Sequence, residues 1–250
     1  PTPLPPRAPA SERLQRLRFA FAKTGDLALL SHLDAVRLLE RALRRSGLPV
    51  SFTGGFHPLP RLQFALALPL GVEADGEWLD LEMAEAVAPE QVRDRLKAQL
   101  PSEFRLLSVL EVPLGGPSLS QELASARWTM ELLPEPAAAL APGSWRQALE
   151  DLLQAPEWIW RDTDKKGRPR ERDCRPYLLG LDLLAPVADA GAGGATLRFD
   201  AVIDPQGRSL RPEQLQQWFS QKLDQPLALG RLRRERLVLM APKGSPLGAC

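Results

Sequence analysis

Residues 17–47, LRFAFAKTGDLALLSHLDAVRLLERALRRSG, decide the fold because they contain a strand and a helix in direct succession. The run 17–22 alternates in side-chain character, which predicts a strand. Ser31 is a suitable N-cap for the helix, and Asp34 at the third helical position comes close to a capping box. Apolar residues then recur at helical spacing up to Gly47, a residue type that commonly ends helices.

The rest of the first half supplies four more strand segments and one more helix. A strand begins at 50–52, and the following loop, 53–61, is irregular because it is rich in Gly and Pro. The remaining predicted elements are an antiparallel pair at 62–68 and 77–83, a helix at 89–100 and a strand at 104–112. This β-α-β-β-α-β order is typical of a ferredoxin-like domain, with two helices on one face of an antiparallel sheet.

The second half repeats this order of elements. Strands are predicted at 127–133, 157–161, 177–184, 196–204 and 229–240, and helices at 144–154 and 212–223. We therefore predict an α+β protein of two tandem ferredoxin-like domains. Its expected parts are a Pro-rich linker at 1–13, a first domain at 14–116 and a second domain with a basic loop at 117–250.

The composition bounds the class of protein. Its 250 residues, 44% hydrophobic and 25% charged, are enough for two globular domains. The net charge of +1 does not by itself favour nucleic acid, so local clusters of charge matter more. No apolar run approaches the ~20 residues that span a bilayer, and the N-terminus lacks a signal-peptide pattern. Two lone cysteines, Cys174 and Cys250, favour a reducing compartment, so we expect a cytoplasmic protein without a membrane contact.

The sequence contains no recognisable catalytic or metal centre. It has two histidines and two cysteines, and none of the CxxC or HxxxH spacings that bind zinc or iron–sulfur clusters. A Walker loop and a GxGxxG motif are also absent. Asp80 and Glu82 form a carboxylate pair, which alternation along a strand places on one face, and we expect that face to be exposed to solvent.

Three longer motifs carry a resemblance to a known family. They are KTGDLALLSHLD at 23–34, GGFHPLPRLQFALALPLGVE at 54–73 and RDCRPYLLGLDLL at 172–184. Over residues 17–240 the chain resembles the radical SAM-linked domain of unknown function (DUF2344). Two positions depart from the family's pattern: Leu59 stands where a second histidine is common, and Cys174 stands where a hydrophobic residue is common.

The resemblance implies a companion for this chain. Family members are accessory domains encoded beside, or fused to, a radical SAM protein, and they lie near a ribonuclease of the E/G type and ribosomal-protein genes. A radical SAM cluster needs three cysteines that this chain lacks, so S-adenosylmethionine and the iron–sulfur cluster are expected only in a fused or partner domain. The Pro-rich start would suit the exit from such a domain.

The Gly/Pro loop at 53–61 is the first candidate site. Its glycines permit close backbone approach, Phe56 and His57 can stack on a base, and Arg61 can hold a phosphate. The alternative is a tight connection in which Phe56 fills the core and His57 is a hydrogen-bonded polar group.

Helix 31–47 offers two further candidates. His32, with Lys23 nearby in sequence, lies at the helix start, where backbone donors can bind an anion, although capping alone also explains this pattern. Four arginines share one side of the helix and can follow a phosphate backbone, or they form an ordinary solvated face. They are Arg37, Arg41, Arg44 and Arg45.

The segment 161–175 is the fourth candidate and the most basic, with seven basic and four acidic residues. Its basic residues are Arg161, Lys165, Lys166, Arg168, Arg170, Arg172 and Arg175. We expect a flexible hairpin tip or loop, and mobile basic loops commonly contact RNA. The alternative is a merely soluble loop.

Three hypotheses of function follow from these observations. The first is an RNA-recognition module that holds a structured RNA, such as tRNA or ribosomal RNA, for a radical SAM partner. The second is an adaptor that docks on the radical SAM protein without contacting RNA. The third is an enzyme that uses His57 or His32 as a general acid or base, although neither histidine has an evident nucleophile or orienting partner.

Overall fold

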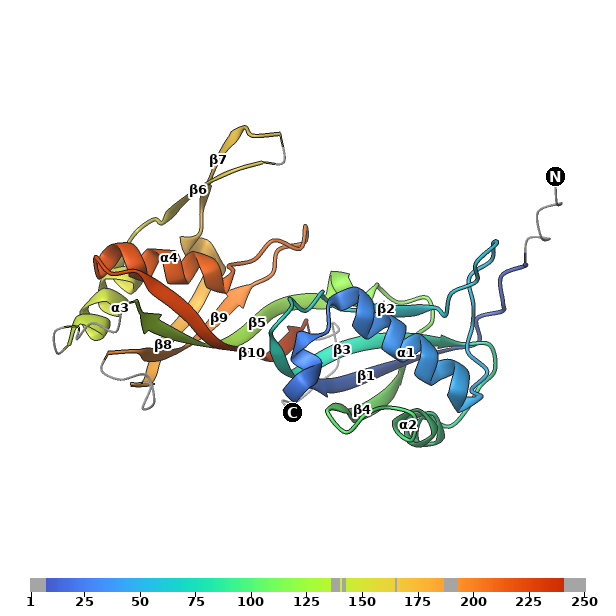
Figure 1. Ribbon diagram of the computed structural model, residues 1–250. Helices are drawn as coiled ribbons and strands as arrows, with labels where there is room; N and C mark the ends of the chain where they lie inside the picture. The colour runs from blue at the N-terminus through green and yellow to red at the C-terminus, as the bar shows by residue number, and fades with distance from the viewer. Residues whose placement is uncertain (1–7, 136–139, 141–142, 165, 187–192, 241–250) are drawn as a thin grey trace, which may run out of the picture. The chain divides into compact units, whose positions relative to one another are not determined.

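The computed structural model describes residues 8–135, 140, 143–164, 166–186 and 193–240. The chain belongs to the α+β class, as predicted, and divides into two compact units, residues 1–122 and 123–250. Four α-helices occur in the described residues (Figure 1): α1 (His32–Ser46), α2 (Pro89–Lys97), α3 (Ser144–Gln154) and α4 (Pro212–Lys222). The predicted helices are thus confirmed, with ends that differ by no more than three residues.

Unit 1 contains a four-stranded antiparallel sheet. Its strands are β1 (Gln15–Lys23), β2 (Leu62–Phe64), β3 (Glu73–Met83) and β4 (Phe104–Val112), with two short 3₁₀ helices at Gly25–Leu29 and Leu119–Glu122. The strands lie in the order β4-β1-β3-β2, and every neighbouring pair is antiparallel. The element order in this unit is β-α-β-β-α-β, as the sequence predicts.

Helix α1 begins and ends where its local sequence dictates. The Ser31 hydroxyl accepts a hydrogen bond from the Asp34 amide (3.2 Å), and Gly47 ends the helix in the left-handed region at φ 61°. Its apolar side, including Leu39, packs with α2 on one face of the sheet. The core there includes Leu17 and Phe19, both fully buried.

Two predicted strands in unit 1 are shorter than expected. Residues 50–52 make only isolated bridges to Met83 and Pro60, because the prolines around them limit the ladder. The strand predicted at 62–68 ends at Phe64, since the chain leaves β3 after the Ala65 amide donates to the Trp78 carbonyl (2.9 Å).

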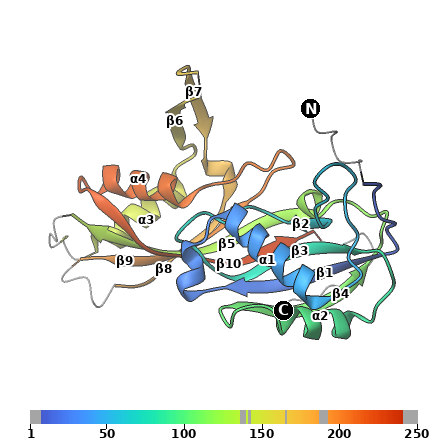
Figure 2. The same ribbon diagram turned by 45° about the vertical axis from the view of Figure 1, so that its right-hand side comes forward.

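Unit 2 has the same strand order and one additional hairpin. Its sheet contains β5 (Leu123–Pro134), β8 (Leu178–Pro186), β9 (Ala195–Val202) and β10 (Leu227–Leu239) in the antiparallel order β10-β5-β9-β8. Strands β6 (Ile159–Thr163) and β7 (Pro169–Asp173) pair with each other and form a separate two-stranded sheet. The hairpin leaves the body of unit 2 in both views (Figures 1 and 2). The strand predicted at 157–161 is therefore the first arm of an inserted hairpin.

None of the helices in the described residues is long and apolar enough to cross a membrane.

Candidate functional site

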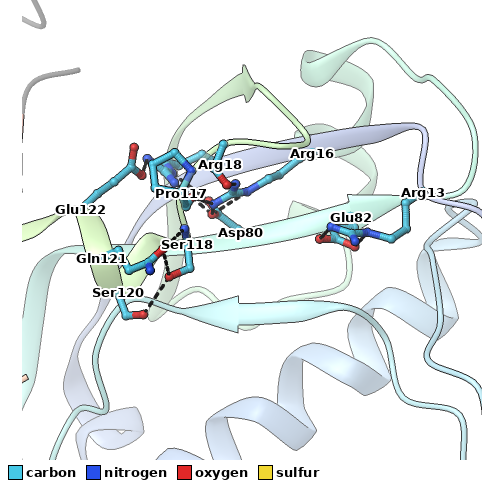
Figure 3. Close-up of polar contacts among 11 residues, drawn as sticks. Arg13, Arg16, Arg18, Asp80, Glu82, Pro117, Ser118, Ser120, Gln121 and Glu122 are labelled. Carbon is cyan, nitrogen blue, oxygen red and sulfur yellow. Dashed lines mark hydrogen bonds and ion pairs between the residues drawn. The ribbon is translucent and has the colours of Figure 1, made fainter. Parts of the chain in front are cut away.

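A buried cluster of arginine and carboxylate side chains lies on the face of the unit 1 sheet opposite the helices (Figure 3). Arg16 and Arg18 alternate with Leu17 and Phe19 along β1, so the guanidinium groups point away from the core. Nε and Nη2 of Arg16 lie 2.9 and 2.5 Å from Oδ2 of Asp80. Nε of Arg18 lies 2.8 Å from Oδ1 of Asp80, and Nη2 lies 3.0 Å from Oδ2. Asp80 is 3% exposed, and the two arginines offset the cost of burying its charge.

The segment 113–122 closes over this cluster. Two of its backbone carbonyls accept hydrogen bonds from Arg16 at 2.9 and 3.4 Å, and the Glu122 carboxylate lies 2.5 Å from Nη1 of Arg18. Burial lowers the pKa of the Arg18 guanidinium, but its hydrogen bonds and ion pairs with Asp80 and Glu122 outweigh burial and raise that pKa above its ordinary value. Arg18 is therefore a fixed, charged part of the interior, and Arg16 is held by the same Asp80 carboxylate and by two backbone carbonyls.

The expectation that Asp80 and Glu82 face solvent is wrong. They do share one face of β3, but segment 113–122 and the arginines of β1 cover Asp80, and the Glu82 side chain is only 18% exposed. Glu82 binds Arg13, whose Nε and Nη2 lie 2.5 and 2.6 Å from the two carboxylate oxygens (Figure 3). Alternation along the strand correctly predicts that Asp80 and Glu82 share a face, but it does not predict that other segments cover that face.

A cavity of about 400 Å³ lies beside this cluster. Three guanidinium groups line it, from Arg13, Arg16 and Arg61, together with the carboxylates of Asp80 and Glu82. Apolar residues in the lining are Leu59, Pro60, Leu62 and Leu114, although the Leu62 side chain packs against the core. The lining therefore contains both charged and apolar residues, and the size of the cavity is within the range of small-molecule sites.

Arg61 differs from the other two arginines of the cavity. Its backbone is held in place, because its amide donates to the Ser51 carbonyl (2.8 Å) and its carbonyl accepts from the Glu82 amide (3.0 Å). Its Nε lies 3.9 Å from Glu82, beyond hydrogen-bond distance, and within the described part of the chain this buried nitrogen has no hydrogen-bond partner. The side chain is 30% exposed.

The Gly/Pro loop carries its aromatic residues away from the cavity. Thr53 closes the loop, since its amide donates to the Leu59 carbonyl (2.9 Å) and its hydroxyl accepts from the Leu59 amide (3.1 Å). Phe56 is 54% exposed and His57 is also exposed, while neither lines the cavity. The idea that Phe56 fills the core is therefore wrong, and the structure separates Phe56 and His57 from Arg61.

The glycines of this loop serve a backbone pairing. Gly55 adopts φ 123° and exchanges two backbone hydrogen bonds with Ala8, at 3.0 and 3.1 Å. A Cβ at Gly54 would lie 3.0 Å from the Ala10 backbone nitrogen. The residues before β1 therefore run against the loop at close range.

The predicted basic face of α1 is partly used in structural contacts. Arg37 pairs with Asp34 (3.2 Å). Arg44 approaches the Pro58 carbonyl (3.5 Å) and lies over the Phe52 ring at 5.5 Å. The two remaining arginines differ: Arg41 is exposed, while Arg45 donates to the Gln99 carbonyl (2.8 Å). Two of the four arginines, Arg44 and Arg45, therefore contact the backbone of neighbouring segments.

Lys23 and His32 lie in partly or fully buried surroundings. Lys23 is 2% exposed, and its Nζ donates to the Leu30 carbonyl (3.1 Å). The His32 ring packs edge-on against Phe64, with centroids 5.2 Å apart. The placement of Lys23 gives no support to the prediction that it contacts RNA.

The β6–β7 hairpin arranges its charges in cross-strand pairs. Arg161 binds Glu171 (2.7 Å), and Arg170 binds Asp162 through two hydrogen bonds of 3.0 and 2.8 Å. At the tip of the hairpin, Arg168 pairs with Asp164 at 2.6 Å. The arginine side chains remain 58–72% exposed, and the tip residue Lys166 is exposed as well. Lys165 lies outside the described residues.

The base of the hairpin is anchored to the body of unit 2. Arg172 lies over the Tyr177 ring at 5.2 Å and donates to the Gln214 side chain (3.1 Å). Arg175 donates to the Leu153 carbonyl (3.0 Å). Of the predicted basic residues, these two therefore hold the hairpin in place, and those nearer the tip present charge to solvent.

Two turns of unit 2 have the same sequence pattern and the same hydrogen bonds. In D-K-K-G-R at 164–168 and D-P-Q-G-R at 204–208, the aspartate Oδ1 accepts from the second and fourth following amides, and Oδ2 accepts from the arginine Nε at 2.7 Å. The glycines adopt φ 76° and 75°. The hydrogen bonds from Arg168 lower the pKa of Asp164, and the hydrogen bond from Arg170 lowers the pKa of Asp162.

Sequence reasoning missed the buried cluster of unit 1, formed by Arg16, Arg18, Asp80 and Glu122, and the neighbouring Arg13. A signal for it exists: Arg16, just before the predicted strand 17–22, and Arg18 within it are two apart, as are the carboxylates of Asp80 and Glu82 on another predicted strand. Among the described residues, no group of three or more His, Cys, Asp or Glu side chains is placed to hold a metal ion.

Comparisons with known proteins give a family and little else. A family model described as "Uncharacterized protein conserved in bacteria (DUF2344)" matches residues 16–212. No curated protein matches the chain. Among solved structures, an unknown protein from Galdieria sulphuraria is similar at 12% identity over 86% of this chain and 96% of that one, with a TM-score of 0.26. A putative glycine cleavage system transcriptional repressor is similar at 12% identity over 88% and 98%, with a TM-score of 0.22. Similarity this low carries no argument about function.

Proposed function

This chain belongs to the DUF2344 family, and we propose that it is a recognition module that binds structured RNA, such as tRNA or ribosomal RNA, on behalf of a radical SAM protein. The proposal treats each unit as a ferredoxin-like domain. The shared antiparallel strand orders, β4-β1-β3-β2 and β10-β5-β9-β8, support this view. Recognition is assigned to the segment that unit 2 adds to this common plan, the β6–β7 hairpin.

The observation that carries the proposal is the distribution of arginines on the hairpin. Arg170 and Arg172 alternate along β7, so their side chains lie on one face about 7 Å apart, and Arg168 lies in the turn directly before this strand. Arg168 and Arg170 are bound to aspartates in exposed pairs, which are individually weak. A phosphate can therefore replace an aspartate as the partner of a guanidinium group.

The salt dependence of RNA binding tests this proposal. In a titration of tRNA or ribosomal RNA fragments, we expect affinity to fall steeply between about 50 and 200 mM salt. Replacing Lys166, Arg168 and Arg170 by Gln removes three charges. We expect the slope of log K against log salt to decrease by about one for each phosphate that the variant no longer neutralises.

A matched control removes the same charge elsewhere. Arg93, Lys97 and Arg105, on α2 and β4, are replaced by Gln in unit 1. This variant is expected to retain the wild-type slope. Salt-insensitive binding, no binding, or equal decreases in affinity for the two triple variants would each contradict the proposal.

S-adenosylmethionine and its cluster are assigned to the partner and not to this chain. The cluster of a radical SAM protein needs three cysteine ligands, and this chain has only Cys174 and Cys250. Cys174 is fully buried, and burial raises the pKa of its thiol. Its sulfur accepts a hydrogen bond from the side-chain amide of Gln214 (3.4 Å). These residues do not fit the cluster, so the proposal includes no step through it.

An exposed apolar patch favours the second candidate function, docking on the radical SAM protein without RNA. Leu29, Leu33 and Leu70 are 66–70% exposed. The Gly71 amide donates to the Ala28 carbonyl (2.8 Å), which brings these segments of unit 1 together. Clustered exposed leucines are typical of protein contact sites. If docking is the function, co-purification survives nuclease and is abolished when the three leucines are replaced by Ser.

A further inference from the structure

The lining of the unit 1 cavity carries more basic than acidic residues, with Arg13, Arg16 and Arg61 against Asp80 and Glu82. Asp80 already accepts four hydrogen bonds, from Arg16 and Arg18. Oε1 of Glu82 accepts a hydrogen bond from Arg13, whereas its buried Oε2 lies in ion pairs with Arg13 (2.5 Å) and Arg61 (3.9 Å) and has no hydrogen-bond partner within the described residues. Asp80 is therefore fully engaged by arginines, while Arg61 keeps a buried Nε without a hydrogen-bond partner in the described residues, 3.9 Å from Glu82.

Arg61 is positioned to use this donor on a ligand. Two backbone hydrogen bonds, to Ser51 and from Glu82, fix its main chain beside the cavity. Its guanidinium approaches Glu82 only to 3.9 Å, and its buried Nε has no hydrogen-bond partner in the described residues. A buried unsatisfied donor is costly in a protein that gains nothing from it. A guanidinium presents a planar fork that matches the two oxygens of a carboxylate or phosphate.

The rest of the cavity limits the size and character of the ligand. Leu59, Pro60 and Leu114 add apolar residues to the lining, and the volume of about 400 Å³ holds a small molecule rather than a folded chain. The floor is rigid, because Arg16 bonds to Asp80 and to the carbonyls of segment 113–122. Such a floor preorganises the site at little entropic cost.

We propose that this cavity binds a small organic anion, with an oxyanion head group on Arg61 and an apolar or planar body against Leu59, Pro60 and Leu114. Arg13 and Glu82 form the charged rim beside the head group. The site lies entirely in unit 1 and does not depend on RNA binding by the β6–β7 hairpin of unit 2. The two proposals can therefore fail separately.

Calorimetric titration of the full chain tests this site with two anions and their neutral counterparts. The anions are benzoate, a carboxylate, and adenosine monophosphate, a phosphate monoester; benzamide and adenosine are the neutral controls. We expect at least one anion to bind and its neutral counterpart to bind at least about tenfold more weakly, as the removal of a charged hydrogen bond implies. The anion that binds identifies the head group.

Two variants locate the binding. Arg61→Gln is expected to weaken the anion at least about tenfold. Leu114→Trp, which places a larger side chain at a lining residue of the cavity without changing charge, is expected to abolish binding. Arg93→Gln on α2, outside the cavity lining, is the control and is expected to bind as the wild type does. Thermal unfolding of each variant checks that the units remain folded.

Three outcomes would overturn the proposal. They are the absence of binding by both anions at millimolar concentration, equal binding of an anion and its neutral counterpart, and wild-type binding by folded Arg61→Gln. If Arg61→Gln fails to fold, Leu114→Trp decides the question alone. Loss of RNA binding with retained anion binding would contradict only the function proposed for the hairpin.

Discussion

Each unit places an arginine opposite an aspartate at the corresponding position of its own sheet, but the surroundings of the two pairs differ. In unit 1, Arg18 of β1 lies opposite Asp80 of β3; in unit 2, Arg127 of β5 lies opposite Asp200 of β9. The first pair is 8% and 4% exposed, and the second is 31% and 28% exposed. The difference comes from segment 113–122, which covers the face of unit 1. A covered pair becomes a buried network beside a cavity, whereas an uncovered pair stays an ordinary surface contact.

The units also differ in the connection between their first helix and the next strand of their sheet. In unit 1 this connection contains the loop 53–61, with the exposed Phe56 and the cavity residue Arg61. In unit 2 the same connection contains the β6–β7 hairpin and its arginines. The loop with Arg61 in unit 1 and the β6–β7 hairpin in unit 2 therefore occupy the same position in the order of elements. The two units have the same strand order but carry different residues at this position.

The largest expected effect comes from removing the aspartate of each pair. Asp80→Asn leaves two buried guanidinium groups short of a counter-charge, and we expect it to destabilise unit 1 by about 3–5 kcal/mol. Asp200→Asn removes a partly exposed partner and should cost about 1 kcal/mol or less. Native-state hydrogen exchange of β1 and β5 amides measures the two effects separately. Similar destabilisation by the two variants would mean that coverage by segment 113–122 does not set the strength of the pair.

The sequence was sufficient wherever the signals are local. Ser31 and Gly47 define the ends of α1 by their own hydrogen bond and dihedral angle, so the helix could be predicted within one residue. The β-α-β-β-α-β order of unit 1 could likewise be read from periodicity. These elements depend on neighbours within a few residues.

The candidate site could be predicted only in part, because its partners are distant in sequence. Asp80 lies more than 60 residues from Arg16 and Arg18, and the segment 113–122 that covers them contains only a short 3₁₀ helix at Leu119–Glu122. Alternation predicted that Asp80 and Glu82 share a face, but nothing local shows that the face is covered. Arg61 was predicted to bind an anion from its loop, and its place beside a cavity required the fold.

A smaller effect is expected at the glycines of the two matching turns. Gly167 and Gly207 both have positive φ and room for a Cβ, so alanine causes strain in the backbone without a clash. Gly207→Ala lies in a turn whose Asp204 accepts a hydrogen bond from Tyr177 (3.0 Å), and we expect it to lower the stability of unit 2 by about 1 kcal/mol. Gly167→Ala strains a two-stranded hairpin, which is marginal alone.

We therefore expect Gly167→Ala to open the β6–β7 hairpin locally and to leave the unfolding transition of unit 2 unchanged. Denaturant unfolding followed by tryptophan fluorescence reports the unit, and amide exchange in β6 and β7 reports the hairpin. Equal shifts of the unfolding midpoint for the two variants would show that the hairpin is a structural part of unit 2 and not an independent addition.

The smallest effect, and the most local, is expected from acid. The hydrogen bonds from Arg170 and Arg168 hold the pKa values of Asp162 and Asp164 below the ordinary value of 3.8. A carboxylate whose pKa is lower in the folded state contributes its stabilisation above the unfolded pKa, and loses it as pH falls through the folded pKa. Protection of the β6–β7 amides should therefore be constant from neutral pH to about pH 5 and decrease below about pH 4. Replacing both aspartates by Asn should remove this dependence.

A hairpin that stays protected down to about pH 2, or that opens near neutrality, would show that its ion pairs are not what holds the two strands together. In that case the arginines of β7 would owe their positions to the anchoring of Arg172 alone, and their exchange of aspartate for phosphate would lose its structural basis.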